Sequence, residues 1–284
     1  MVRKEAMPLK KVENNKWATL LPKGYLSPSA VESFLLCPHA WYLRYVIGVR
    51  PLGIYPATQE GKAMHAMLEE NNREKVNTGD DMKPKQAVEC FQDHWSDYSK
   101  EVTNWDGEKK DTISERGEAQ SNNYIKKHAS KYVADPDGIE KKISFEIAGI
   151  PFLGFIDFQG ESTMKDPGSS IGVRTDKVIL DYKNVKSAKS LTELKTGIQM
   201  GVYAEATGIR TVEYISFVKT KSPRIDKKRA VRSDQDQDNV VRVIQGVADA
   251  IKKGSFPYCN PSSWKCCERY CDVHYQCAQG KGKL

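Results

Sequence analysis

The chain has 284 residues, 39% of them hydrophobic and 29% charged, which is typical of a folded protein with a polar surface. The 44 basic and 37 acidic residues give a net charge of +7, which by itself favours an anionic partner only weakly. No run of about 20 apolar residues occurs, and this excludes a transmembrane helix. The N-terminus lacks the apolar segment of a signal peptide, so we expect a cytoplasmic location.

The chain is predicted to begin with an arm that leads into a helix. Residues 1–25 are polar and are predicted to be extended. Ser27 is a candidate N-cap, and Pro28 suits the first helical position. Pro38 ends that helix. The preceding Cys37 is either a buried cysteine of the core or a ligand for a centre shared with the distant C-terminal cysteines.

Further helices are predicted up to residue 135. Residues 26–75 form the first helical part and include His65, which lies beside an apolar helix face. Taken alone, a histidine in such a position is more often structural than catalytic. Residues 76–135 are predicted to form a helical subdomain or lid, with helices over roughly 84–103 and 112–133.

The hydrophobic pattern changes from helical to alternating after a predicted turn at residues 136–138. Two strands, over residues 143–147 and 150–158, are predicted to form a hairpin with an Ala-Gly turn between them. Residues 160–176 are rich in Gly, Ser, Asp and Lys and are predicted to be a surface loop. A strand over residues 177–182 follows.

The next elements are a helix over residues 191–207, a strand over 211–219 and a last helix over 234–253. The segment before the last helix contains one acidic residue and seven basic residues, which are Lys219, Lys221, Arg224, Lys227, Lys228, Arg229 and Arg232. A basic loop of this density suits a phosphate backbone. A solvated charged segment is the more common alternative.

The most informative stretch is the apolar strand that ends at Asp181 and Lys183. These residues are two apart, so in a strand both side chains point to one face. Asp157 ends a second apolar run. Two carboxylates and a lysine on adjacent strands can hold a hard divalent cation and polarise an attacking water. Gln199 and Tyr203 are four apart and share one face of the following helix.

Seven cysteines are present, and five of them lie within the last 26 residues. An odd number in a cytoplasmic chain argues against a disulfide framework, and a local cluster instead indicates metal or iron–sulfur ligation. Three thiolates in a compact loop come from Cys266, Cys271 and Cys277. Cys267 is the alternative to Cys266. The fourth ligand is either Cys37 or, for zinc, His274.

These segments resemble the PD-(D/E)XK nuclease superfamily in its RecB/AddB-like branch, which includes CRISPR-adaptation nucleases and many phage exonucleases. Each segment is a weak signal, but six in the family's order are specific. They are Ser29…Cys37-Pro38, Gly61-Lys62-Ala63-Met64-His65, Gly154-Phe155-Ile156-Asp157, Asp181-Tyr182-Lys183, Gln199-x3-Tyr203 and the cysteine tail. Asp181 departs from the glutamate common in that branch, and the loop over residues 159–176 is long.

The resemblance implies a role for each matched residue. The implied ligands of Mg²⁺ or Mn²⁺ are His65, Asp157, Asp181 and the main-chain carbonyl of Tyr182. Lys183 would orient or activate the attacking water and stabilise the developing phosphorane charge. Gln199 and Tyr203 would hold the DNA backbone or the geometry of the active site. A four-iron four-sulfur cluster would be bound by Cys37, Cys266, Cys271 and Cys277, with zinc as the alternative occupant.

The resemblance also implies an α/β (α+β) restriction-endonuclease-like fold. A central mixed sheet flanked by helices would form the nuclease core over residues 136–254, with the helical subdomain inserted before it and a cluster-binding tail over 255–284. The implied activity is that of a Mg²⁺- or Mn²⁺-dependent deoxyribonuclease, an exonuclease acting on single-stranded DNA or duplex ends, with endonuclease activity as a further alternative. A bacterial or phage-encoded protein of recombination, repair or CRISPR-type DNA processing is expected.

Two alternatives belong to other functional classes. One is a non-catalytic DNA-binding module whose cysteine tail is a structural metal site. The other is a subunit whose activity is gated by a partner in a recombination or CRISPR-type complex. The intact set of Asp157, Asp181 and Lys183 argues against the first, because binding alone does not need a carboxylate pair beside the lysine.

Overall fold

The computed structural model describes residues 21, 23–165, 173–220 and 222–281. The described residues form two compact units: those up to Arg50, those within 143–154 and those from Val241 onward make the first, and those within 51–142 and 155–240 make the second. The arm predicted for residues 1–25 lies almost wholly outside the described residues, and the five-part division predicted from the sequence stays a prediction. Within the described ranges, no helix has an apolar stretch long enough to cross a bilayer.

Helices and strands follow one another in an α+β order. The helices are α2 (Pro28–Leu36), α3 (Pro38–Tyr42), α4 (Pro56–Thr78), α5 (Pro84–Tyr98), α6 (Lys110–Lys127), α7 (Leu191–Thr196), α8 (Ile198–Thr207), α9 (Asp234–Lys252) and α10 (Ala278–Lys281). Short helical turns are η1 (Leu43–Ile47), η2 (Ser99–Glu101), η3 (Ala129–Lys131) and η4 (His274–Gln276). The strands are β1 (Tyr132–Ile147), β2 (Ile150–Lys165), β3 (Val173–Val185), β4 (Thr211–Val218) and β5 (Arg224–Val231).

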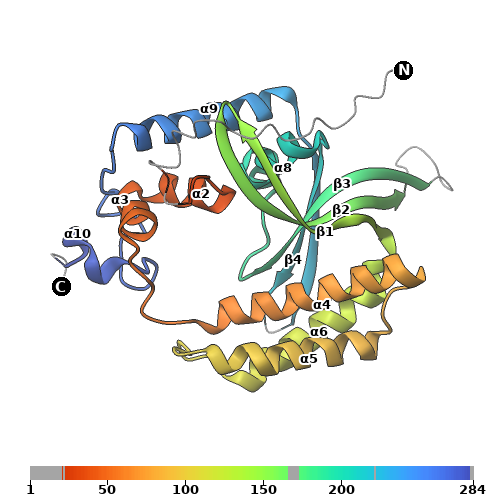
Figure 1. Ribbon diagram of the computed structural model, residues 1–284. Helices are drawn as coiled ribbons and strands as arrows, with labels where there is room; N and C mark the ends of the chain where they lie inside the picture. The colour runs from red at the N-terminus through yellow and green to blue at the C-terminus, as the bar shows by residue number, and fades with distance from the viewer. Residues whose placement is uncertain (1–20, 22, 166–172, 221, 282–284) are drawn as a thin grey trace, which may run out of the picture. The chain divides into compact units, whose positions relative to one another are not determined.

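These five strands form a mixed sheet in the order β1-β2-β3-β4-β5. β3 and β4 are parallel, whereas β2 with β3 and β4 with β5 are antiparallel. One face of the sheet packs against α4 and α6, and α5 packs on these two helices (Figure 1). The apolar core between them includes Met64, Phe91, Trp95, Tyr124, Phe158, Leu180 and Phe217. The prediction of a central mixed sheet flanked by helices is confirmed.

The helix predicted over residues 191–207 is two helices, because the backbone is extended at Gly197 between α7 and α8. A helix end leaves main-chain carbonyls without helical partners. The buried guanidinium of Arg232 donates to the carbonyl of Leu194 at 2.9 Å and to that of Gly197 at 3.4 Å. This side chain stabilises the break, which sets the direction of α8 and of the residues that it presents to β3.

Most of the loop predicted over residues 160–176 is strand, because β2 continues to Lys165 and β3 begins at Val173. The two strands pair along this stretch, with Thr163 opposite Thr175. Hydrogen bonding to a neighbouring strand here outweighs the weak strand propensity of Gly, Ser and Asp.

The turn predicted at residues 136–138 also lies inside a strand, β1. A Cβ atom on Gly138 would lie 2.1 Å from the carbonyl oxygen of Gln159, so glycine is needed there for the close approach of β1 and β2. The Ala-Gly hairpin turn is confirmed: Ala148 and Gly149 join the two strands with φ angles of +50° and +73°, as a two-residue hairpin turn requires.

The first unit joins the N-terminal helices to two other segments of the chain. Ser27 caps α2 as predicted, since its hydroxyl accepts a hydrogen bond from the amide of Ala30 at 3.2 Å. Leu26 donates to the carbonyl of Pro151 and accepts from the amide of Leu153, both at 2.9 Å. The ring of Trp41, which is buried, stacks on Phe256 at the start of the cysteine tail.

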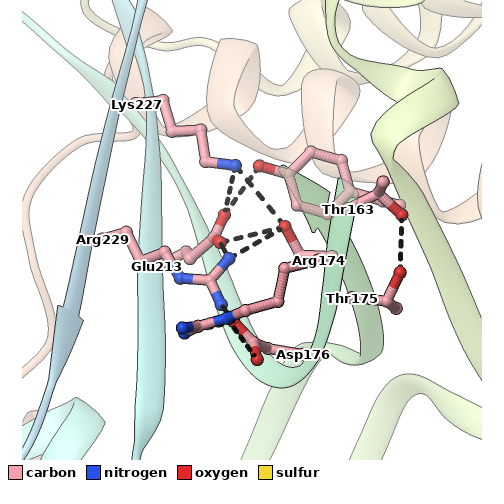
Figure 2. A network of polar contacts seen from close by, with 9 residues as sticks. Thr163, Arg174, Thr175, Asp176, Glu213, Lys227 and Arg229 are labelled. Carbon is pink, nitrogen blue, oxygen red and sulfur yellow. Dashed lines mark hydrogen bonds and ion pairs between the residues drawn. The ribbon is translucent and has the colours of Figure 1, made fainter. Parts of the chain in front are cut away.

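Within the segment predicted as a basic loop, Arg224–Val231 form the strand β5, and the loop prediction is wrong for this part. Arg229 of β5 stands opposite Glu213 of β4, whose side chain is fully buried. Figure 2 shows Lys227 and Arg229 directed at the Glu213 carboxylate, at 3.1 and 2.9 Å. The hydroxyls of Tyr132 and Ser162 also donate to that carboxylate, at 2.7 and 3.0 Å.

Other basic residues of the same segment also have acidic or carbonyl partners. Lys219 forms an ion pair with the buried Glu60 at 2.7 Å. Arg224 and Lys228 are more exposed and lie 3.8 and 3.3 Å from Asp226. Lys221 lies outside the described residues. The charges of this strand therefore balance carboxylates of the fold, and their density is not evidence for a DNA-binding loop.

Candidate active site

Asp181 and Lys183 lie on the same side of β3, as their two-residue spacing predicts. The side chain of Asp181 is 1% exposed, and its Oδ2 is 2.7 Å from Nζ of Lys183. Gln199, in the first turn of α8, joins the two. Its amide nitrogen donates to Oδ1 of Asp181 at 2.7 Å, and its oxygen accepts from Nζ of Lys183 at 2.9 Å. The ammonium group of Lys183 is thus held by two acceptors, which are the buried carboxylate of Asp181 and the amide oxygen of Gln199.

Tyr203 lies one helical turn beyond Gln199 and fastens α8 to β2. Its hydroxyl donates to the carbonyl of Phe155 at 2.6 Å and lies 3.3 Å from the amide nitrogen of Gln199. Burial raises the pKa of Tyr203 above its ordinary value, so the hydroxyl stays a neutral donor. Tyr203 therefore fixes the position of Gln199, and through it the position of Lys183.

In the antiparallel pairing of β2 with β3, Phe158 stands opposite Leu180. Asp157 and Asp181 are the next residues on the two strands, in the same direction along the sheet. Oδ2 of Asp157 accepts a hydrogen bond from the main-chain amide of Tyr182 at 2.8 Å. His65, on α4, reaches the same place: its Nε2 is 3.1 Å from the Tyr182 carbonyl oxygen, and its Nδ1 is 3.7 Å from Oδ2 of Asp157. Three of the four predicted metal ligands therefore meet here, while Asp181 contacts Lys183 and Gln199.

Glu140 is a site residue that the sequence analysis missed. Its Oε1 lies 3.9 Å from Nδ1 of His65, and His65, Glu140 and Asp157 offer ligand atoms that all lie within 4.8 Å of one another. Glu140 has a φ angle of +47° within β1, a left-handed conformation that costs a non-glycine residue about 1–3 kcal/mol. Two lysines follow it in the sequence, so locally it resembles an ordinary surface charge.

Negative charge accumulates around this group of side chains. Burial, reinforced by the charge of Asp181, raises the pKa of Asp157 to about 7. Burial acts to lower the pKa of His65, but the nearby carboxylate of Glu140 and the charges of Asp157 and Asp181 outweigh it and raise that pKa to about 9. Such a site favours a bound cation.

The donor set fits a divalent metal ion. Carboxylate and carbonyl oxygens are the ligands that Mg²⁺ and Mn²⁺ prefer, and imidazole suits transition metals. The site offers carboxylates from Glu140 and Asp157, the carbonyl oxygen of Tyr182 and the imidazole of His65.

A second group of candidate ligands lies in the first unit, where five cysteines line one cavity. They are Cys37, Cys259, Cys266, Cys271 and Cys277. The amide of Ala40 donates to the sulfur of Cys37 at 3.4 Å, and the side chain of Gln279 donates to the sulfur of Cys266 at 3.2 Å. The four cysteines proposed from the sequence thus face a common space, although Cys37 is far from the others along the chain.

The structure distinguishes the two neighbouring cysteines of the tail. Cys266 lines the cavity, whereas Cys267 is not among the described residues that line it. The thiol of Cys267 instead donates a hydrogen bond to the carbonyl of Trp264 at 3.3 Å. Cys259 is a lining residue that the sequence analysis did not assign, although its place in the cysteine-rich tail was a signal. His274, the predicted zinc alternative, also lines the cavity.

A mixed sheet flanked by helices, with Asp157, Asp181 and Lys183 gathered on adjacent strands, defines a restriction-endonuclease-like α+β fold. The sequence profile of the PD-(D/E)XK nuclease superfamily matches residues 25–278. The chain belongs to this superfamily, and the resemblance seen in the sequence is confirmed at that level. The RecB/AddB-like branch stays a prediction.

Solved structures include a protein of similar fold. The crystal structure of a "putative exonuclease" from Eubacterium rectale superposes with a TM-score of 0.53 at 15% identity, covering 92% of this chain and 93% of the other. A second structure, of SSO0001, has a TM-score of 0.35 at 12% identity over 90% and 94% of the chains, too low to support an argument. No curated protein matches the chain.

Proposed function

We propose that the protein is a divalent-metal-dependent DNA exonuclease. The observation that carries this proposal is the convergence of Asp157 of β2, Asp181 and Lys183 of β3, and His65 of α4 where the two strands lie side by side. A DNA-binding surface would gain nothing from buried carboxylates, which repel phosphate. Membership of a nuclease superfamily supports the reaction class, and the name of the structural neighbour supports an exonuclease.

The substrate would be single-stranded DNA or the end of a duplex, in recombination, repair, or phage or CRISPR-type DNA processing. His65, Glu140, Asp157 and the carbonyl of Tyr182 would hold Mg²⁺ or Mn²⁺, with Asp181 beside them as the further predicted ligand. When bound, the cation supplies Lewis-acid polarisation of the phosphate and lowers the pKa of water.

Lys183 would stabilise the negative charge that develops on the phosphate and orient the attacking water. Its contacts with Asp181 and Gln199 hold the ammonium in place before substrate binds, so little reorganisation accompanies the reaction. Gln199 and Tyr203 would act as positioning residues, because they contact Lys183 and the backbone of β2 respectively.

The proposal predicts that cleavage needs both a metal ion and a DNA end. We expect linear DNA labelled at its 5′ or 3′ end to be degraded with Mn²⁺ or Mg²⁺, and covalently closed circular DNA to stay intact. EDTA should stop degradation, and Asp157→Asn should lower it by at least about 100-fold, because one metal-binding carboxylate is lost.

Other results of the same assay would contradict the proposal. DNA binding that is unaffected by EDTA and produces no cleavage would favour the non-catalytic DNA-binding module. Cleavage of the circle at the rate of the linear substrate would make the enzyme an endonuclease. The two labels also give the direction of degradation.

For the cysteine cavity we propose a four-iron four-sulfur cluster bound by Cys37, Cys266, Cys271 and Cys277. The support is that five cysteines line the cavity, because a four-iron four-sulfur cluster is held by four cysteine thiolates. The hydrogen bond from Gln279 to the sulfur of Cys266 is of the kind that tunes cluster potentials. A Cys₄ zinc site is the alternative occupant.

Two cysteines of the same loop provide a matched test of the cluster. In anaerobically purified protein we expect Cys271→Ser to lose most of the visible absorbance and bound iron, since Cys271 lines the cavity. Cys267→Ser should retain both, because its thiol is bonded to the carbonyl of Trp264 instead. A colourless wild-type protein with one equivalent of zinc would overturn the iron–sulfur assignment.

A further inference from the structure

A third group of potential metal ligands lies between α4 and α5, apart from the residues described above. Cys90 and His94 are four residues apart on α5 and therefore share one face of that helix. Glu70 of α4 faces both. Its Oε1 is 2.6 Å from Nε2 of His94, and its Oε2 accepts a hydrogen bond from the thiol of Cys90 at 3.2 Å.

We propose that Glu70, Cys90 and His94 form a zinc site that fastens α5 to α4. Their three ligand atoms lie within 4.8 Å of one another. Zn–N, Zn–O and Zn–S bond lengths place the ligand atoms of a tetrahedral site roughly 3.3–3.6 Å apart. The existing contacts of 2.6 and 3.2 Å therefore need to open by less than about 1 Å, a shift within the range of side-chain rotation.

The chemistry of the donors selects the metal. A thiolate and an imidazole suit Zn²⁺, whereas Mg²⁺ and Ca²⁺ prefer oxygen ligands. Without the metal, Glu70 accepts hydrogen bonds from the thiol of Cys90 and from Nε2 of His94. Zn²⁺ binding would displace these two protons. Asp93 adds negative charge beside Cys90.

The surroundings leave room for a fourth ligand. The side chain of Glu70 is 50% exposed and that of His94 is 28% exposed, so water can complete the tetrahedron. Cys90, in contrast, packs against the core beneath the helices. Glu70 lies five residues after His65 on α4, so the two side chains leave the helix on different faces. The zinc site is thus separate from the candidate active site on the same helix.

The test uses Co²⁺ as a spectroscopic probe in the full-length, chelator-treated protein. We expect Cys90→Ser and His94→Gln each to bind one equivalent of Co²⁺ less than the wild type. Cys90→Ser should also lose the thiolate-to-cobalt charge-transfer intensity that belongs to one sulfur. Cys267→Ser, which removes a cysteine of the tail outside the cavity, is the matched control and should bind as the wild type does.

The tail cysteines are further potential Co²⁺ ligands in chelator-treated protein, so the difference between variants, rather than the total, carries the result. Added Zn²⁺ should raise the melting temperature of the wild type more than that of either variant, because the metal joins two helices. Equal stoichiometry in the wild type and in His94→Gln, whose side chain is partly exposed and tolerates the change, would overturn the proposal.

Discussion

Replacing Lys183 with alanine is expected to reduce DNA cleavage by about 100- to 1000-fold, the usual effect of removing one preorganised group that stabilises transition-state charge. Its Nζ is held 2.7 Å from Asp181 and 2.9 Å from Gln199, so the wild-type ammonium is fixed next to the proposed metal ligands. The loss should appear in kcat more than in KM, because the group acts on charge that develops during the reaction. Initial rates on end-labelled linear DNA with Mn²⁺ would measure it.

The control for this variant is Lys189→Ala, which removes the same charge from a partly exposed lysine paired with Glu193. We expect it to change the cleavage rate less than twofold. Because alanine at position 183 leaves the buried Asp181 without a cation, thermal unfolding of the variant must be measured as well. Equal cleavage by a folded Lys183→Ala variant and by the wild type would refute the assignment of this residue and the proposed activity with it.

Replacing Glu213 with glutamine is expected to lower the free energy of unfolding by about 3–5 kcal/mol, the usual cost of removing one partner of a buried ion pair. Glu213 is fully buried, and its carboxylate balances Lys227 and Arg229, whose side chains are 21% and 12% exposed (Figure 2). Glutamine keeps the shape and one acceptor for the Tyr132 hydroxyl, but it leaves the two cations without this charge. Chemical denaturation would give the change directly.

Two further variants separate the charge effect from a packing effect. Glu161→Gln neutralises an exposed carboxylate that pairs with Lys177 and should change stability by less than about 1 kcal/mol. Adding Lys227→Met to Glu213→Gln should recover part of the lost stability, because one unbalanced cation is removed and the apolar part of the side chain is kept. If Glu213→Gln is as stable as Glu161→Gln, the network does not contribute as proposed.

Local pattern correctly placed several elements. The two-residue spacing of Asp181 and Lys183 put both on one side of a strand, where the structure has them. Ala148-Gly149 identified the hairpin turn, and the apolar period identified the helices that cover the sheet. These features follow from short-range geometry, since side-chain direction repeats every two residues in a strand and every 3.6 in a helix.

The outcome for the basic segment shows where local pattern fails. Seven basic residues with one acid form no apolar period, and such a segment reads as a loop. Its residues 224–231 form β5, where Lys227 and Arg229 have a buried carboxylate on the neighbouring strand. That acid, Glu213, is separated from them by more than ten residues, so no local rule connects it to them.

By itself, then, the sequence determined the family, the order of most elements and the side of β3 that carries Asp181 and Lys183. Tertiary structure alone brought Glu140 to His65, Cys259 to the cavity of the other cysteines, and Cys90 and His94 to Glu70. The physical reason is the same for each. The partners in each contact come from segments far apart in the sequence, so no local spacing connects them, and they meet only because distant parts of the chain pack together.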